Sequence, residues 1–184
     1  AAFAGVAVEV EHIGSTSVPG LAAKPVIDVL LGAESLAAIE SRIGAVEGAG
    51  YQYVPRYERE IPMRRYFVKP AGSGSLRVHL HGVVRGSPIW REHIAFRDAL
   101  RADESLRAGY QSLKLELAAR FAHDKPAYTE AKGPFIRSAL LRIPALLLGL
   151  VLAAKPVEAG PQAAEIQRAA KRPTGSKWSM RKRA

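Results

Sequence analysis

The first third of the chain shows strand-like and helix-like spacing of its apolar residues. Val6, Val8 and Val10 alternate with smaller or acidic residues, a two-residue period typical of a strand with one wet face. Residues 25–31, PVIDVLL, are apolar on both faces apart from Asp28 and predict a central strand covered on both sides. Residues 33–48 carry apolar side chains at spacings of three and four, which predict an amphipathic helix.

The middle of the chain predicts further strands. Short candidates cover residues 51–54 and 65–69, and a turn at 71–74 precedes a longer strand at 76–84. In this longer strand, LRVHLHGVV, the apolar side chains at alternate positions point one way. Arg77, His79 and His81 must therefore share the opposite face.

Helices follow from residue 87 onward. Ser87 and Pro88 are a cap and a first-turn proline for a helix that continues to about Arg101. A second amphipathic helix is expected from about Glu104 to His123, with Pro126 as its stop. A third is expected over 128–141, interrupted at Gly133-Pro134.

The last forty residues change the charge balance and the domain organisation. Residues 143–154 are apolar or small throughout, but this run is shorter than the ~20 residues that span a bilayer. It predicts a helix packed on the core or on a partner, with a contact to one membrane surface as the alternative. The net charge is +10, and seven Lys or Arg with no acid follow Ile166. This tail is expected to be disordered, either simply solvated or weakly binding polyanions. The predicted division is a domain over 1–141, an apolar helical extension over 142–160 and a basic tail over 161–184.

The absence of cysteine excludes a disulfide framework and a thiolate zinc site. The first residues do not resemble a signal peptide. We therefore expect a cytoplasmic protein without a transmembrane segment.

The turn Gly14-Ser15-Thr16-Ser17 offers backbone N–H groups and three hydroxyls, which suit phosphate oxygens. The alternative is an ordinary connecting turn, because Ser and Gly are common in turns. Asp28 must be paired, hydrogen-bonded or bound to a cation, since an ionised carboxylate is costly to bury in an apolar strand. Its candidate partners are Lys24, an arginine or a magnesium ion.

His79 and His81 are candidates for metal ligands, phosphate donors or a general base, with ordinary hydrogen-bonded histidines as the alternative. Arg77 on the same strand face would add positive charge toward an anionic ligand. The preceding segment supplies more arginines, namely Arg56, Arg59, Arg64 and Arg65.

Several of these motifs, in the same order, resemble the GrpB family of small bacterial proteins over roughly residues 8–140. They are HIGSTSVPGLAAKPVIDVLL, LRVHLHGVV, Trp90, FRDALR, Tyr110 with Leu113-Lys114, and YTEAKGPFI. The family is placed in the nucleotidyltransferase superfamily of DNA polymerase beta-like fold, and some members are fused to dephospho-CoA kinase. The resemblance implies an α+β fold with a mixed sheet flanked by helices. It also implies a phosphate loop at Gly14-Ser15 and a metal carboxylate at Asp28.

The chain departs from the wider superfamily at the second carboxylate. Active members carry a D-x-D or D-x-E pair, whereas the second position here is Leu30. The third carboxylate of the superfamily normally lies on a later strand, where this chain has His79 and His81. A mechanism with two metals needs carboxylates that bridge both cations, so these replacements count against it.

Three functional hypotheses follow. The first is a nucleotidyltransferase that uses Mg²⁺ or Mn²⁺ at Asp28, with Ser15 holding phosphates and Lys114 among the residues that neutralise charge. The second is a module that binds a nucleotide or a CoA-like phosphate without catalysis. The third is an association with nucleic acid through the tail, which the lack of interleaved aromatic residues disfavours.

Overall fold

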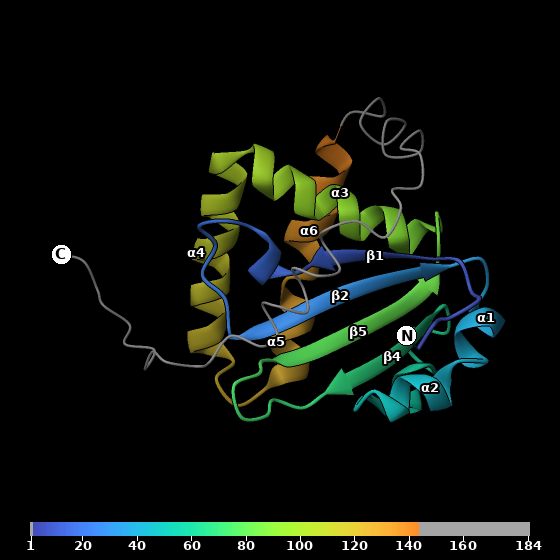
Figure 1. Ribbon diagram of the computed structural model, residues 1–184. Coiled ribbons are helices and arrows are strands. Elements are labelled where there is room, and N and C mark those ends of the chain that lie inside the picture. The colour runs from blue at the N-terminus through green and yellow to red at the C-terminus, as the bar shows by residue number, and fades with distance from the viewer. Residues whose placement is uncertain (1, 144–184) are drawn as a thin grey trace.

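A computed structural model describes residues 2–143 of the chain, which fold into a mixed sheet with helices on both faces (Figure 1). The strand order is β1-β2-β5-β4-β3, and β2 and β5 are the parallel pair. The strands are β1 (Val8–Ile13), β2 (Val26–Ala33), β3 (Gln52–Tyr53), β4 (Arg64–Lys69) and β5 (Arg77–Val84). This architecture confirms the expected α+β fold.

Short helices follow β2, and longer ones follow β5. The α-helices are α1 (Leu36–Glu40), α2 (Ile43–Gly48), α3 (Pro88–Ala102), α4 (Glu104–Arg120), α5 (Lys125–Ala131) and α6 (Gly133–Arg142). Two 3₁₀ turns, η1 (Ser15–Ser17) and η2 (Pro55–Tyr57), lie in the connections.

The two faces of the sheet bury different clusters. On one face, Ile27 and Val29 of β2 pack with Ile39 of α1 and Val46 of α2. On the other face, Leu30 of β2 packs with side chains from β1, β5 and α3. Successive residues of a strand point to opposite faces, so Asp28 lies on the same face as Leu30.

A third cluster fixes the segment between β1 and β2. Val18 and Leu21 pack against Leu100 of α3 and Tyr110 of α4. The segment that follows η1 is therefore held by apolar burial on two helices, which positions the polar residues of the turn.

The structure corrects two of the expected helices. The helix expected over 33–48 is two short helices, because the chain turns at Ser41 and Arg42 between them. Pro126 does not stop the preceding helix. It lies in the first turn of α5, where a missing N–H costs no helical hydrogen bond, and α4 already ends at Arg120. The interruption expected at Gly133-Pro134 is found one residue earlier, at Lys132, and Gly133 and Pro134 form the start of α6.

None of the helices within residues 2–143 is long and apolar enough to cross a membrane. The predicted apolar extension over 142–160 and the predicted basic tail over 161–184 fall, apart from residues 142 and 143, outside the described residues.

Candidate functional site

Gly14 brings the backbone after β1 directly against Asp28. Its φ is +72°, a conformation that side-chain-bearing residues rarely adopt. A Cβ atom built on Gly14 would lie 2.4 Å from Oδ2 of Asp28. Glycine is required here for both reasons, and the close approach joins the turn to the carboxylate as one site.

The hydroxyls of the turn have different partners. The Thr16 hydroxyl donates to the Val26 carbonyl at 3.0 Å and lies 3.0 Å from Nε2 of His12. The Ser17 hydroxyl donates to the Gly14 carbonyl at 2.6 Å. Both therefore stabilise the turn itself. The Ser15 hydroxyl instead accepts a hydrogen bond from Nζ of Lys114 at 2.8 Å.

Lys114 reaches the turn from α4. Besides Ser15, its Nζ donates to the Ala22 carbonyl at 2.6 Å. Gln111, one helical turn earlier, accepts a hydrogen bond from the Ala22 N–H at 2.9 Å. Burial lowers the pKa of Lys114 to about 8, and the nearby charge of Lys132 contributes to this lowering. Within residues 2–143, the ammonium of Lys114 thus donates only to uncharged oxygen atoms, the Ser15 hydroxyl and the Ala22 carbonyl.

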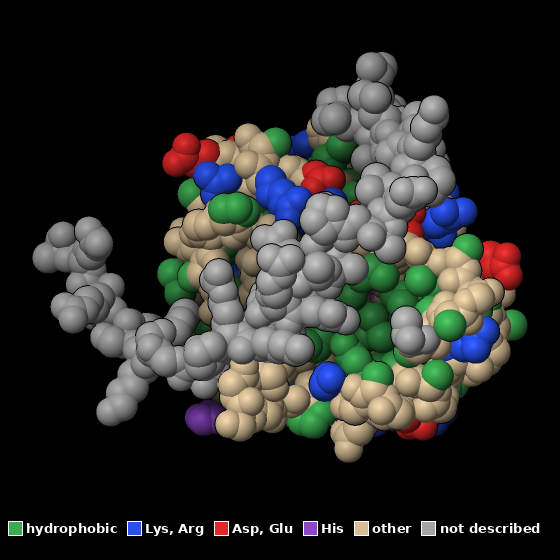
Figure 2. Space-filling view, viewed as in Figure 1, with side chains coloured by type: hydrophobic (Ala, Val, Ile, Leu, Met, Phe, Trp, Pro, Cys, Tyr) green, Lys and Arg blue, Asp and Glu red, His purple; other side chains and the backbone are tan. Residues whose placement is uncertain are grey.

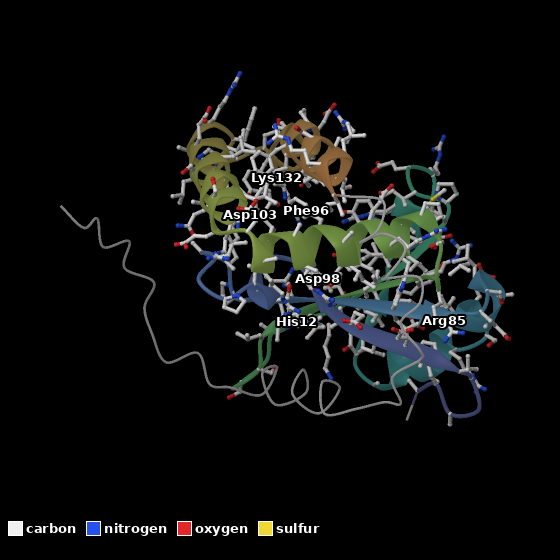
Figure 3. The ribbon with its side chains drawn as sticks, turned by 90° about the horizontal axis from the view of Figure 1, so that it is seen from above. His12, Arg85, Phe96, Asp98, Asp103 and Lys132 are labelled. Carbon is white, nitrogen blue, oxygen red and sulfur yellow. The ribbon has the colours of Figure 1, made fainter. Side chains whose placement is uncertain are left out.

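Lys132 adds a second cation beside Lys114. It lies at the junction of α5 and α6, and in the view from above it is seen between α4 and α6 (Figure 3). Its Nζ is 4.5 Å from the centre of the Tyr128 ring. Burial lowers the pKa of Lys132, whereas the negative charge of Asp28 acts to raise it. Among the described residues, its ammonium forms no hydrogen bond and no ion pair.

Asp28 faces two histidines across the parallel pair of strands. The register places it opposite His79, and Oδ1 lies 3.2 Å from Nδ1 of His79 and 3.7 Å from Nε2 of His81. Burial acts to raise the pKa of Asp28, but the hydrogen bonds from His79 and His81 outweigh it and hold the pKa well below its usual range. The carboxylate is therefore ionised at neutral pH.

The charge on Asp28 fixes the proton on His79. An ionised carboxylate only accepts hydrogen bonds, so Nδ1 of His79 is the donor in this contact. Burial lowers the pKa of His81, and Nδ1 of this ring is buried with no hydrogen-bond partner in the described part of the chain. The arrangement can orient a polar ligand at this end of the sheet.

An aromatic ring and two more bases, not identified as site residues from the sequence, complete this end of the sheet. Tyr66 of β4 lies opposite His81 in the register, and the two ring centres are 5.1 Å apart. The two bases come from elements farther along the chain. His93 lies in α3, and Lys132 lies at the junction of α5 and α6. Nδ1 of His93 donates to the Ile89 carbonyl at 2.7 Å, which leaves Nε2 as its acceptor atom. The alternation of residues in β4 could have identified Tyr66 as a site residue only if the register between β4 and β5 had been known.

The other basic candidates are distributed unevenly. Lys24 is exposed, and its charge acts on Lys132. Arg77 is exposed at the start of β5, and its charge acts on Tyr66. The guanidinium of Arg64 lies 5.1 Å from the centre of the Tyr66 ring. Arg65 points elsewhere, because it pairs with Glu40.

The side chains around Asp28 fit the predicted metal site poorly. No group of three or more His, Asp or Glu side chains within residues 2–143 is arranged to hold a metal ion. Oδ1 of Asp28 faces both histidines, and Leu30, at the position of the second carboxylate, is fully buried among apolar residues. The described residues do not form a ready-made metal site.

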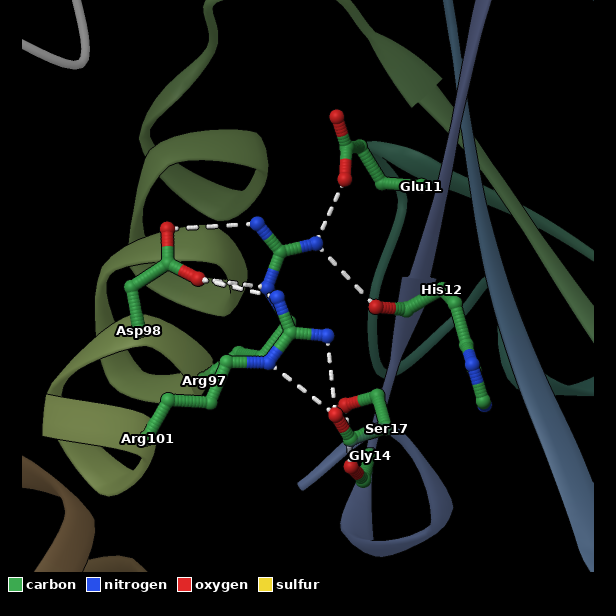
Figure 4. A network of polar contacts seen from close by, with 7 residues as sticks. All are labelled: Glu11, His12, Gly14, Ser17, Arg97, Asp98 and Arg101. Carbon is green, nitrogen blue, oxygen red and sulfur yellow. Dashed lines mark hydrogen bonds and ion pairs between the residues drawn. The ribbon is translucent and has the colours of Figure 1, made fainter. Parts of the chain in front are cut away.

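Arginines of α3 anchor the turn from its other side (Figure 4). Arg97 is buried, pairs with Glu11 of β1, and donates to the His12 carbonyl at 3.1 Å. It also contacts Asp98 through Nε and Nη2, at 2.7 and 3.2 Å. Arg101 donates to the Ser17 carbonyl through Nε and Nη2, at 3.0 and 2.8 Å. Both ends of the turn are therefore fixed to one helix.

The surface over α3 and α4 carries both signs of charge. Figure 2 shows Lys and Arg side chains beside Asp and Glu side chains along this upper edge. A nucleic-acid interface has a continuous basic stripe, and this visible edge has none.

Comparison with known proteins shows what this chain is similar to. UPF0157 protein YqkA of Bacillus subtilis is 36% identical over 132 residues, which are 72% of this chain and 37% of that protein. A dephospho-CoA kinase of Mycolicibacterium paratuberculosis is 32% identical over 157 residues, covering 74% of this chain and 39% of that protein. The chain thus spans well under half the length of these two relatives.

A solved structure supports the same grouping. The crystal structure of conserved protein GrpB from Enterococcus faecalis matches with a TM-score of 0.61 and 34% identity, covering 71% of this chain and 76% of that one. The family model described as GrpB protein matches residues 1–142. This chain therefore belongs to the GrpB family.

Proposed function

We propose that this protein binds a phosphate-bearing small molecule where η1 meets α4 and the junction of α5 and α6. One observation carries the proposal: Lys114 and Lys132 are both partly buried, and neither forms an ion pair within residues 2–143. Burial lowers the pKa of Lys114, and the charge of Lys132 lies close enough to lower it further. Two partly buried ammonium groups repel one another. An anionic group between them would offset this repulsion and the loss of hydration.

The turn supplies the neutral part of such a site. The Ser15 hydroxyl already contacts Nζ of Lys114, so a phosphate oxygen at this point would meet both groups. Because Gly14 has no side chain, the backbone of the turn can lie directly against Asp28. Lys24 and Arg77, both exposed, would add positive charge at the rim.

A nucleotide is the ligand class that we propose first, because the family resemblance implies a nucleotidyltransferase-like site. A CoA-like phosphate is the second class, motivated by a relative that is named dephospho-CoA kinase. Both classes carry phosphate groups that two lysines and a serine can hold.

Metal-assisted nucleotidyl transfer is the further hypothesis. It needs Mg²⁺ or Mn²⁺ at Asp28, whereas the observed carboxylate is hydrogen-bonded to histidines and Leu30 closes the second position. The proposed binding does not depend on a metal. A comparison with and without divalent cations therefore separates binding from this stronger hypothesis.

Thermal unfolding with a ligand panel tests the proposal. The panel contains nucleoside mono-, di- and triphosphates and CoA species, each with and without Mg²⁺ or Mn²⁺. We expect at least one phosphate ligand to raise the melting temperature without metal, and Lys114→Met to abolish the rise. Lys69→Met is the control, because Lys69 also donates to a main-chain carbonyl but lies away from η1, at the end of β4.

Either of two outcomes would contradict the proposal. One is the absence of any ligand-dependent rise in the wild-type protein. The other is an equal rise in the wild-type protein and in Lys114→Met. A rise that appears only with metal and is lost in Asp28→Ala would instead support the metal hypothesis.

A further inference from the structure

A groove lies beside η1, where the segment after the turn meets α3 and the start of α4. Its volume is about 540 Å³, and it is lined by Ser17, Pro19, Arg101 and Arg107. This volume falls within the range of ordinary small-molecule sites, ~300–1,000 Å³. The two arginines come from different helices, α3 and α4, so the fold brings two guanidinium groups to one opening.

The guanidinium groups in the groove are held mainly by main-chain oxygen atoms. Arg101 donates twice to the Ser17 carbonyl. Arg107 donates through Nη1 to the carbonyls of Leu100 and Arg101, at 3.0 and 3.3 Å. These contacts fix the orientation of both side chains without neutralising their positive charge.

The nearby carboxylates neutralise little of this charge. Asp98 is 3.6 Å from Nη1 of Arg101, but both of its oxygen atoms already receive hydrogen bonds from Arg97. Asp103 and Glu104, at the start of α4, form no ion pair with Arg107, and Asp103 accepts from the Leu106 N–H instead. Within residues 2–143, Nε and Nη2 of Arg107 make no hydrogen bond.

Nε–H and Nη2–H form the edge of a guanidinium that binds two oxygen atoms of one anion at once. In Arg107 the described residues leave this edge unused, while Nη1 anchors the side chain. The geometry points to the groove as a second anion-binding site, which takes an oxyanion group of a small molecule, phosphate or carboxylate, on Arg107 with Arg101 beside it.

This site is separate from the one formed by Lys114 and Lys132. The two sites share the turn and α4 but use different side chains: the Ser17 carbonyl holds Arg101, whereas the Ser15 hydroxyl contacts Lys114, which lies seven residues after Arg107 on α4. An anion can therefore bind in the groove whether or not the site at Lys114 and Lys132 is occupied.

The test follows the Nε–H signals of Arg101 and Arg107 by NMR in the full chain. Inorganic phosphate and malonate are titrated separately, with sodium chloride at matched ionic strength as the reference. We expect a saturable shift of the Arg107 signal with phosphate, malonate or both, and the comparison of the two tells which oxyanion the groove prefers. The shift should persist in Lys114→Met, which removes the other proposed site.

Two further variants test the role of the paired Nε–H and Nη2–H donors of Arg107. Arg107→Lys keeps the positive charge but removes the paired donors, so the backbone N–H signal of Ser17, which lines the groove, should require at least about tenfold more anion for the same shift. Arg120→Lys, at the other end of α4, should leave the affinity unchanged. Thermal unfolding without anion checks that both variants are folded.

Three results would overturn the inference. They are no saturable shift of the Arg107 signal, an equal shift with chloride, and a phosphate response that disappears in Lys114→Met. A response of Arg107 without any response of Ser15 or Lys114 would leave this inference standing and would count against the proposed function.

Discussion

At Gly14 the chain has room only for hydrogen on the side that faces Asp28. Gly14→Ala must take a positive φ and must also displace the carboxylate, since the new methyl group would lie 2.4 Å from Oδ2. We expect a loss of about 2–4 kcal/mol in the free energy of unfolding, measured by urea denaturation. Gly20→Ala is the control, because Gly20 has φ +78° and its new methyl group would meet no described atom within 4 Å.

The control should lose only about 1–2 kcal/mol, the cost of the left-handed conformation. Equal losses in the two variants would contradict the close approach of the turn to Asp28.

The shifted pKa of Lys114 predicts a pH dependence of stability. Its pKa is about 8 in the folded protein against 10.5 ordinarily, so between these values the unfolded chain binds more protons. The free energy of unfolding of the wild-type protein, relative to Lys114→Met, should therefore rise with pH across this window. Urea denaturation of both proteins at several pH values measures it. A flat or falling difference would show that the ammonium is not buried as described.

At the scale of elements, the anchoring of β1 and η1 to α3 depends on Arg97. Arg97→Met leaves Glu11 without its ion-pair partner and the His12 carbonyl without its donor. We expect a loss of about 2–4 kcal/mol in the free energy of unfolding, because an ion pair that is largely buried loses one member. Arg120→Met, on the exposed end of α4, should change it by no more than about 0.5 kcal/mol. Similar effects in the two variants would contradict the anchoring.

Elements with a clear period were predictable from the sequence. The alternation in residues 76–84 placed His79 and His81 on one face. In the structure both rings lie on the same face, beside Asp28, a neighbour that the alternation could not identify. The break between α1 and α2 was not predictable from spacing, because the apolar positions of both helices continue one helical pattern. Lys132 and His93 gave no local signal, since only the packing of α3, α5 and α6 brings them to the sheet.

At the scale of the whole molecule, the fold class and the family were accessible from motif order, whereas the chemistry of the site was not. Asp28 fits a metal ligand and a hydrogen-bond acceptor equally well until the register of β2 and β5 is known. The register pairs it with His79, which gives the carboxylate a protein partner. Nucleotide binding and a metal at Asp28 stay predictions.

The central claim is that Lys114 and Lys132 together hold a phosphate group. Its most direct test is a calorimetric titration with the nucleoside triphosphate that gives the largest thermal shift, in the absence of divalent metal. We expect saturable binding that weakens at least about tenfold, or about 1.4 kcal/mol, in Lys132→Met. Undetectable binding to the wild-type protein, or unchanged affinity in Lys132→Met, would contradict the claim.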